Sequence, residues 1–215
     1  MLEIRYLLEG LSITLQIWAG ALVLSVLLAI PVAMLRRSTN GFARFVGAVW
    51  AWIARGIPPI AWLIIIYFGL SLGIISEVPV LAAIVGLGFV NSAYIGDSIR
   101  SGLDAVPKGQ WEGAAAVGLS KLDTLRFVVL PQAIPVTLAS TAAYSITLLK
   151  NTAIASIIGA NEMMFYAYNA VQVGAEPIPA FLTIGLVYLL ISVPIGFLAR
   201  WLDARATAHR RVGVA

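Results

Sequence analysis

The chain has 215 residues, of which 60% are hydrophobic and 11% charged, and its mean hydropathy is +0.95. This composition excludes an ordinary soluble domain, in which charged residues alone make up about a quarter of the chain. Cysteine is absent, so disulfides, thiolate metal sites and thiol nucleophiles are excluded, and the single histidine is His209. The net charge of +4 says less than the positions of the charged residues.

Five stretches without Asp, Glu, Lys or Arg come close to the roughly 20 residues that a helix needs to cross hydrocarbon. They are continuously apolar, which favours helices over the alternating strands of a membrane barrel. We therefore predict an all-α integral membrane protein formed by one domain, 1–215. Its five transmembrane helices are expected at about 10–35, 54–76, 78–99, 127–149 and 178–200.

The stretch 42–54, between the first two spans, mixes Arg44 with aromatic residues such as Trp50 and Trp52. Two interpretations stand equal: a segment lying at the membrane interface, or an extension of the second span. Pro58 and Pro59 follow, and they are expected to break or restart the helix, because proline lacks an amide donor and restricts the residue before it.

Residues 100–126 are the only extended polar section besides the C-terminal tail. Within them, Pro107 and Gly118 bracket an Ala-rich segment, as proline and glycine do at helix starts and ends. We predict a short helix at about 109–118, with Glu112 in its first turn, where the helix dipole favours a carboxylate. On these features alone, a simple connector between the third and fourth spans is the commoner structure.

The apolar stretch 127–160 would measure about 50 Å as one helix, so it must start outside the bilayer, bend or break. Pro131 and Pro135 are candidate bending points. Lys150 then lies within the membrane, where an ionisable residue is by default a candidate functional residue. Its alternative role is structural: it pairs internally or extends its amine toward the surface.

Asn91 and Tyr94 lie one helical turn apart in the third span, and they either share a cavity with Lys150 or form hydrogen bonds between helices. Asp97 and Arg100 are expected to form a local ion pair near the inner end of the same span.

The distribution of Lys and Arg predicts the orientation. The segments 36–55 and 100–126 and the tail from Arg200 hold four cations each, twelve of the 14 in the chain. Cytoplasmic loops carry an excess of Lys and Arg. We therefore predict an N-terminus outside, a C-terminus inside, and the helix at 109–118 in the cytoplasm.

Several blocks, in order along the chain, resemble the polar amino-acid permease family of ATP-binding-cassette (ABC) importers. The most specific is Gln-Trp-Glu-Gly-Ala-Ala-Ala at 110–116, with Gly118 and then Leu130 and Pro131, which resembles the EAA motif of these permeases. Further blocks are Arg-Gly-Ile-Pro at 55–58, Ile-Tyr-Phe-Gly-Leu at 66–70, Asn-Ser-Ala-Tyr at 91–94 and Leu-Leu-Lys-Asn-Thr at 148–152.

The resemblance implies the transmembrane fold of a type I ABC importer, in which the segment at 109–118 is a coupling helix that docks on a cytoplasmic ATPase. It implies an ATPase-coupling role for six residues: Glu112, Gly113, Ala114, Gly118, Leu130 and Pro131. The chain departs from the family pattern at Gly113, where alanine is usual, and at Ile57, where threonine is usual.

The implied function is that of the permease subunit of an ATP-driven importer of polar amino acids in a prokaryotic inner membrane. The implied partners are a second permease copy, identical or similar, two ATPase subunits that use ATP and magnesium, an extracytoplasmic solute-binding protein and lipid. No nucleic acid, metal or cofactor is expected on this chain, which lacks the phosphate-binding loop of an ATPase.

The expected substrate pathway includes Lys150, Asn151, Asn91 and Tyr94. The family often has an acidic residue at the position of Asn151, so the neutral amide disfavours cationic cargo.

The alternative function is a secondary transporter or channel subunit for small polar solutes, but such proteins usually show internal repeats, and none is evident. An enzyme is not expected, because the usual hydrolytic constellations are missing.

Overall fold

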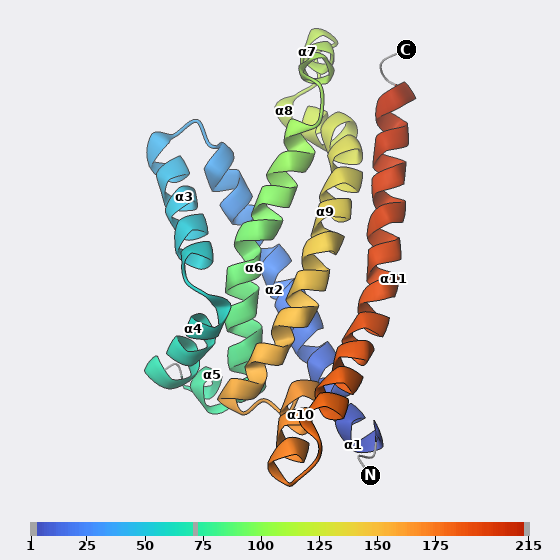
Figure 1. Cartoon of the computed structure of the whole chain (residues 1–215). Helices are drawn as coiled ribbons and strands as arrows, with labels where there is room; N and C mark the ends of the chain where they lie inside the picture. The colour runs from blue at the N-terminus through green and yellow to red at the C-terminus, as the bar shows by residue number, and fades with distance from the viewer. Residues whose placement is uncertain (1–3, 71–72, 213–215) are drawn as a thin grey trace.

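The computed structural model describes residues 4–70 and 73–212, and all regular structure within them is helical. The elements, in chain order, are α1 (Ile4–Leu8), α2 (Leu11–Arg37), α3 (Gly41–Gly56), α4 (Pro59–Ile64), η1 (Ile65–Gly69), α5 (Ile74–Glu77), α6 (Pro79–Asp104), α7 (Lys108–Ala116), α8 (Lys121–Asp123), η2 (Thr124–Val129), α9 (Leu130–Asn151), η3 (Thr152–Ile158), α10 (Met163–Gln172) and α11 (Pro177–Val212). The long helices run side by side along one axis (Figure 1). The helices α7 and α8 lie at the end of the bundle where the chain finishes, and α1 and α10 lie at the opposite end.

Among the described residues, four helical stretches are long and apolar enough to cross a membrane: Ile4–Arg37, Pro79–Asp104, Lys121–Ile158 and Pro177–Ala204. The second of these is α6, which lies at the centre of the bundle. Of the residues in its most apolar part, 61% are buried, against 11% for the corresponding part of α11. Glycine allows the close packing around α6, because a Cβ at Gly88 would come within 2.8 Å of Leu24 on α2. The large exposed side chains of α11 are left for lipid or for another protein chain.

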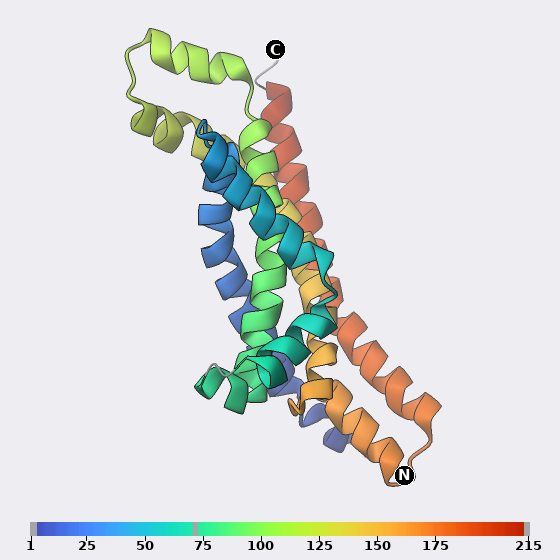
Figure 2. The ribbon, with the colours of Figure 1, turned by 90° about the vertical axis from the view of Figure 1, so that its left-hand side faces the viewer.

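The second span is not the single helix predicted at 54–76. The chain forms α3 and then α4 with η1, and the two parts meet at an angle of 97°, so that together they could make a fifth crossing (Figure 2). The break falls at Ile57, whose backbone is extended (φ −108°, ψ 133°) because Pro58 follows it. The stretch 42–54 is therefore not a straight extension of the helix that follows. Residues 71 and 72, which also belong to the predicted span, lie outside the described residues.

The third long stretch, which corresponds to the fourth predicted span, begins at Lys121, six residues before the predicted start at 127. It passes through a π-helical turn, η2, before Pro131, and ends in a tight 3₁₀ turn, η3, at Gly159. Gly159 has φ +84°, a left-handed conformation that glycine adopts without steric cost. The stretch is longer than one membrane crossing requires, and this length is accommodated because the helix starts earlier than predicted and has irregular helical turns near both ends.

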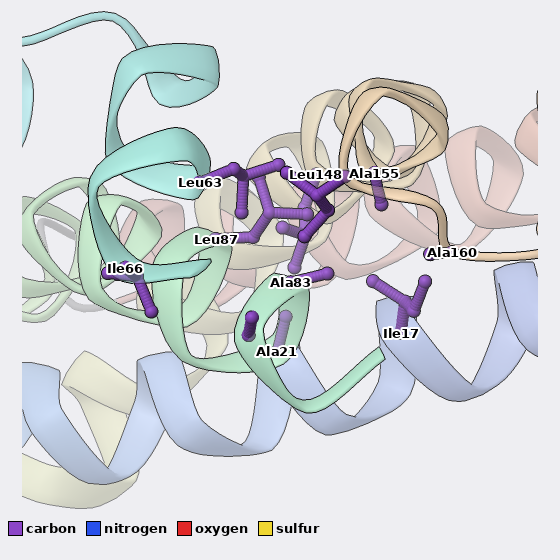
Figure 3. Packing of buried hydrophobic residues seen from close by; sticks show 11 residues of the cluster. Ile17, Ala21, Leu63, Ile66, Ala83, Leu87, Leu148, Ala155 and Ala160 are labelled. Carbon is purple, nitrogen blue, oxygen red and sulfur yellow. The ribbon is translucent and has the colours of Figure 1, made fainter. Parts of the chain in front are cut away.

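The main core lies where the broken span meets the bundle. Leu63 of α4 reaches Leu87 of α6 and Leu148 of α9, above Ala83, and Ile66 of η1 belongs to the same cluster (Figure 3). Hydrophobic transfer from water does not hold helices together inside a bilayer, so this contact depends on close van der Waals packing.

A buried carboxylate organises the end of the bundle opposite α7. Glu162 is fully buried. In the sequence it lies after the stretch that ends at Ile158 and before the one that begins at Pro177, and so outside the membrane-spanning stretches. Its side chain caps α10 by accepting hydrogen bonds from the backbone N–H groups of Met164 (2.9 Å) and Phe165 (2.8 Å), and the Tyr188 hydroxyl donates to it at 2.9 Å. Burial raises the pKa of Glu162 from 4.5 to about 7, although the backbone hydrogen bonds act in the opposite direction.

Candidate functional site

The short helix α7 stands apart from the bundle but is firmly attached to it. Its only large aromatic residue, Trp111, packs into a small core with Val106, Val129 and Ala133. The Gln132 side-chain amide donates to the Gln110 side-chain oxygen at 3.2 Å. The helix is therefore anchored to the end of α6 and to the start of α9 at once.

The end of α7 is built by glycine. Gly118 has φ +80°, and its N–H bonds the Ala115 carbonyl at 3.0 Å, while the Leu119 N–H bonds the Ala114 carbonyl at 3.1 Å. This pair of bonds is the Schellman motif, which satisfies the last carbonyls of a helix and turns the chain. The bracketing by Pro107 and Gly118 thus predicted the helix well, with bounds of Lys108–Ala116 in place of 109–118.

The six predicted coupling residues differ in exposure and lie on α7, just after it, or at the start of α9. Glu112, Gly113 and Gly118 are exposed and Ala114 is buried. Leu130 is half-buried and Pro131 is exposed, both in the first turn of α9.

Large apolar side chains lie exposed beside α7, including Val117 (77%) and Leu122 (71%). An anchored helix with such neighbours has the features of a protein docking surface.

A cavity of about 320 Å³ lies inside the angle of the broken span. The irregular backbone at Ile57 and Pro58 forms one wall. Such backbone is tolerated within a membrane only where protein covers it or it lines a cavity. The other walls come from α6 and α9. The polar or charged lining residues are Arg55, Asn91, Tyr94, Tyr144, Thr147 and Asn151.

Three of the four predicted pathway residues meet in this cavity: Asn91, Tyr94 and Asn151. Lys150 does not share it, which corrects that expectation. It is exposed and lines a different hollow of about 360 Å³, beside Tyr188 and Ser192 of α11. Adjacent residues of a helix point about 100° apart, so Lys150 and Asn151 face different neighbours.

An ion cluster lies next to the cavity. The Asp97 carboxylate pairs with Arg36 of α2, with Arg55 of α3 (2.5 Å) and with Arg100 of its own helix (3.5 Å). The Arg55 guanidinium also lies over the Tyr94 ring, 5.7 Å from its centroid. Only the pair of Asp97 with Arg100 was expected from sequence spacing, because the other two arginines are more than 40 residues away along the chain.

Three cavity residues, Arg55, Tyr144 and Thr147, were not predicted from the sequence. A signal existed for two of them: Tyr144, Thr147 and Asn151 have i, i+3, i+7 spacing, which places them on one face of α9. No local pattern pointed to Arg55, because the bend of the chain brings it to the cavity.

Comparison with known proteins agrees with this geometry. Residues 21–208 match the family described as the binding-protein-dependent transport system inner membrane component. The chain is 29% identical to the arginine transport system permease protein ArtQ of Bacillus subtilis, over 96% of this chain and 95% of that protein. It is 31% identical to the probable amino-acid ABC transporter permease protein YckA of the same organism, over 75% and 72%.

Among solved structures, a chain from the crystal structure of an amino acid ABC transporter with histidines superposes with a TM-score of 0.85, at 27% identity and 94% coverage of both chains. The chain therefore belongs to the inner membrane components of binding-protein-dependent transport systems, as a permease subunit with the type I ABC importer fold.

Proposed function

We propose that this permease subunit carries polar amino acids inward, driven by ATP that partner subunits hydrolyse. Relatives named as arginine and amino-acid permeases support the substrate class. The polar cavity at the bend supports it too, because its Asn, Tyr and Thr side chains can bind both ends of a zwitterion. Asn91, Tyr94 and Asn151 are the proposed contacts along the pathway.

The proposed mechanism is supported by the position of α7, an exposed helix that Trp111 attaches to two long helices. A cytoplasmic ATPase that docks there would move α6 and α9 together when it binds ATP. Movement of packed helices as rigid bodies is a common way to switch a transporter between inward and outward openings. Glu112 is exposed and available for a cation on the ATPase, and Gly113 and Gly118 permit a close approach.

The working assembly is proposed to hold two permease copies, identical or similar, two ATPase subunits and one extracytoplasmic binding protein. Four or five crossings are few to enclose a pathway, and the apolar side chains of α11 are left uncovered in the described chain.

The orientation is proposed as N-terminus outside and C-terminus inside, with 1–215 acting as one permease domain. The end of the bundle that carries α7 and α8 also carries the turn between α2 and α3, and these segments contain Arg37, Arg44, Lys108 and Lys121, which agrees with the excess of cations in cytoplasmic loops. A C-terminal reporter that is active only outside the cytoplasm would overturn this orientation.

Glu112→Lys tests the coupling role. We expect the variant to insert normally but to lose co-purification with the ATPase and ATP-driven amino-acid uptake in vesicles. Glu77→Lys is the matched control, since Glu77 is exposed and its helix α5 lies at the opposite end of the bundle, so its charge reversal should leave ATPase binding intact. Normal ATP-driven uptake by Glu112→Lys would refute the docking role of α7. Uptake by the purified chain alone, driven by an ion gradient, would favour a secondary transporter.

Lys150 remains a candidate pathway residue despite its separate hollow. Lys150→Ala is expected to alter uptake kinetics without loss of folded protein. Unchanged kinetics would assign Lys150 a structural role at the lipid boundary.

A further inference from the structure

The cavity at the bend has an unusual balance of charge. Among its lining residues in the described chain, Arg55 is the only ionised side chain, and none is acidic. The remaining polar groups are neutral amides and hydroxyls. A cationic side chain entering this cavity would find no carboxylate to pair with, and an isolated charge is costly to bury.

Asp97 does not cancel the positive charge of Arg55. The one carboxylate is shared among Arg36, Arg55 and Arg100, so the cluster holds three cations and one anion. The Arg55 guanidinium has five N–H donors, and it uses Nε on the Ala51 carbonyl (3.2 Å) and Nη1 on Asp97. Donors remain for a carboxylate at the mouth of the cavity.

A second group in the cavity lacks a partner. The Asn91 side chain is only 6% exposed, and its Nδ2 has no hydrogen-bond partner in the described part of the chain. A buried amide donor without an acceptor costs free energy, so such a group is usually satisfied by a ligand or water. Asn91 and Arg55 both line the cavity, and a carboxylate is the ligand group that can accept from both a guanidinium and an amide N–H.

We propose that this cavity binds amino acids with neutral or acidic side chains and discriminates against basic ones, with the substrate carboxylate between Arg55 and Asn91. The inference rests on the proposed function and specifies its substrate class. Tyr94, Tyr144, Thr147 and Asn151 then surround the rest of the molecule, with hydroxyl and amide oxygens to accept from the ammonium group.

The test measures binding to the permease itself, because a separate binding protein has its own specificity. The permease–ATPase complex is purified without the binding protein, and equilibrium binding of radiolabelled glutamine, glutamate, arginine and lysine is measured. We expect glutamine or glutamate to bind at least tenfold tighter than arginine or lysine. Arg55→Gln should weaken the binding of the preferred amino acid at least tenfold.

A gain-of-function variant makes the test independent of folding defects. Asn91→Asp places an anion in the cavity and should shift the ratio of arginine to glutamine affinity at least tenfold toward arginine. Asn151→Asp, at a half-buried position of the same cavity, serves if Asn91→Asp does not assemble. Asn40→Asp is the matched control: it makes the same substitution at an exposed helix cap that aspartate also satisfies, so the ratio should not change.

The results distinguish a failure of this inference about specificity from a failure of the proposed function. Tightest binding of arginine or lysine to the unaltered complex, or no shift in either aspartate variant, overturns the inference while leaving amino-acid import in place. If none of the four amino acids binds the complex and none is taken up by the full importer, the proposed function fails as well.

Discussion

The attachment of α7 depends chiefly on one side chain, Trp111, so truncation of that side chain should loosen the helix. Trp111 is mostly buried against Val106, Val129 and Ala133 at the end of the bundle. A buried tryptophan hides roughly 150–250 Å². If Trp111→Ala removes about 130 Å² of buried apolar surface, then at about 25 cal/mol per Å² the attachment of the helix weakens by about 3 kcal/mol.

Amide hydrogen exchange measures this weakening directly. Because about 1.4 kcal/mol corresponds to a factor of ten, exchange in Lys108–Ala116 should accelerate by about a hundredfold, while exchange in α6 stays unchanged. The same variant should retain ATPase activity in the complex but lose most coupled uptake, since movement of a loosened helix is no longer transmitted.

Trp52→Ala is the matched control, because Trp52 is 68% exposed on α3 and its removal leaves Trp111 and its neighbours intact. Trp111→Phe should recover most of the protection, since it retains an aromatic ring. If Trp111→Ala changes exchange in α7 by less than threefold, or if uptake remains normal, Trp111 is not the anchor.

Three further predictions concern stability, each measured by thermal melting of the purified permease. The pKa of Glu162 is about 7 in the folded chain against an ordinary 4.5, so its protonated form favours folding. This contribution, about 3 kcal/mol, is complete below pH 4.5 and is lost as the pH rises through 7. Melting should therefore be higher at pH 5 than at pH 8, and Glu162→Gln should flatten the difference; an equal slope in the variant refutes this. Gly113→Ala should stabilise α7 by about 0.5–1 kcal/mol, because a Cβ there meets nothing within 4 Å, and a lower melting temperature would contradict it. Gly102→Ala should destabilise the bundle by about 1–3 kcal/mol, because its Cβ would lie 2.1 Å from the Thr137 hydroxyl and force α6 from α9; an unchanged melting temperature would show that the two helices absorb the methyl group.

Much of the architecture could be predicted from the sequence, because its causes are local along the chain. A charge-free run near 20 residues specifies a long apolar helix wherever it packs, and the predicted spans at 10–35 and 178–200 overlap the observed helices accordingly. The proline and glycine around 109–118 act on their own backbone, so the short helix was predicted to within two residues at either end. The EAA-like motif pointed to the family because its residues can be recognised in the sequence without knowledge of the fold.

The composition of the cavity could not be predicted in this way. The sequence indicated that the helix would break near Pro58, but it did not give the angle of 97° between the two parts, nor the position of Arg55 over the Tyr94 ring. Likewise, sequence spacing predicted only the pair of Asp97 with Arg100, because helix periodicity gives no information about contacts with residues on other helices.

What the sequence by itself determined is a membrane-spanning chain with a short helix near 109–118, since hydropathy and turn chemistry each act over a few residues. The permease function followed from the resemblance of its motifs to a known family. Only the tertiary structure decided which polar groups share a space. It placed Asn151 in the cavity and Lys150 outside it, although they are neighbours, because adjacent helical residues face different directions. Contacts between helices distant in sequence set the charge of the cavity, and therefore the cargo that it is proposed to admit.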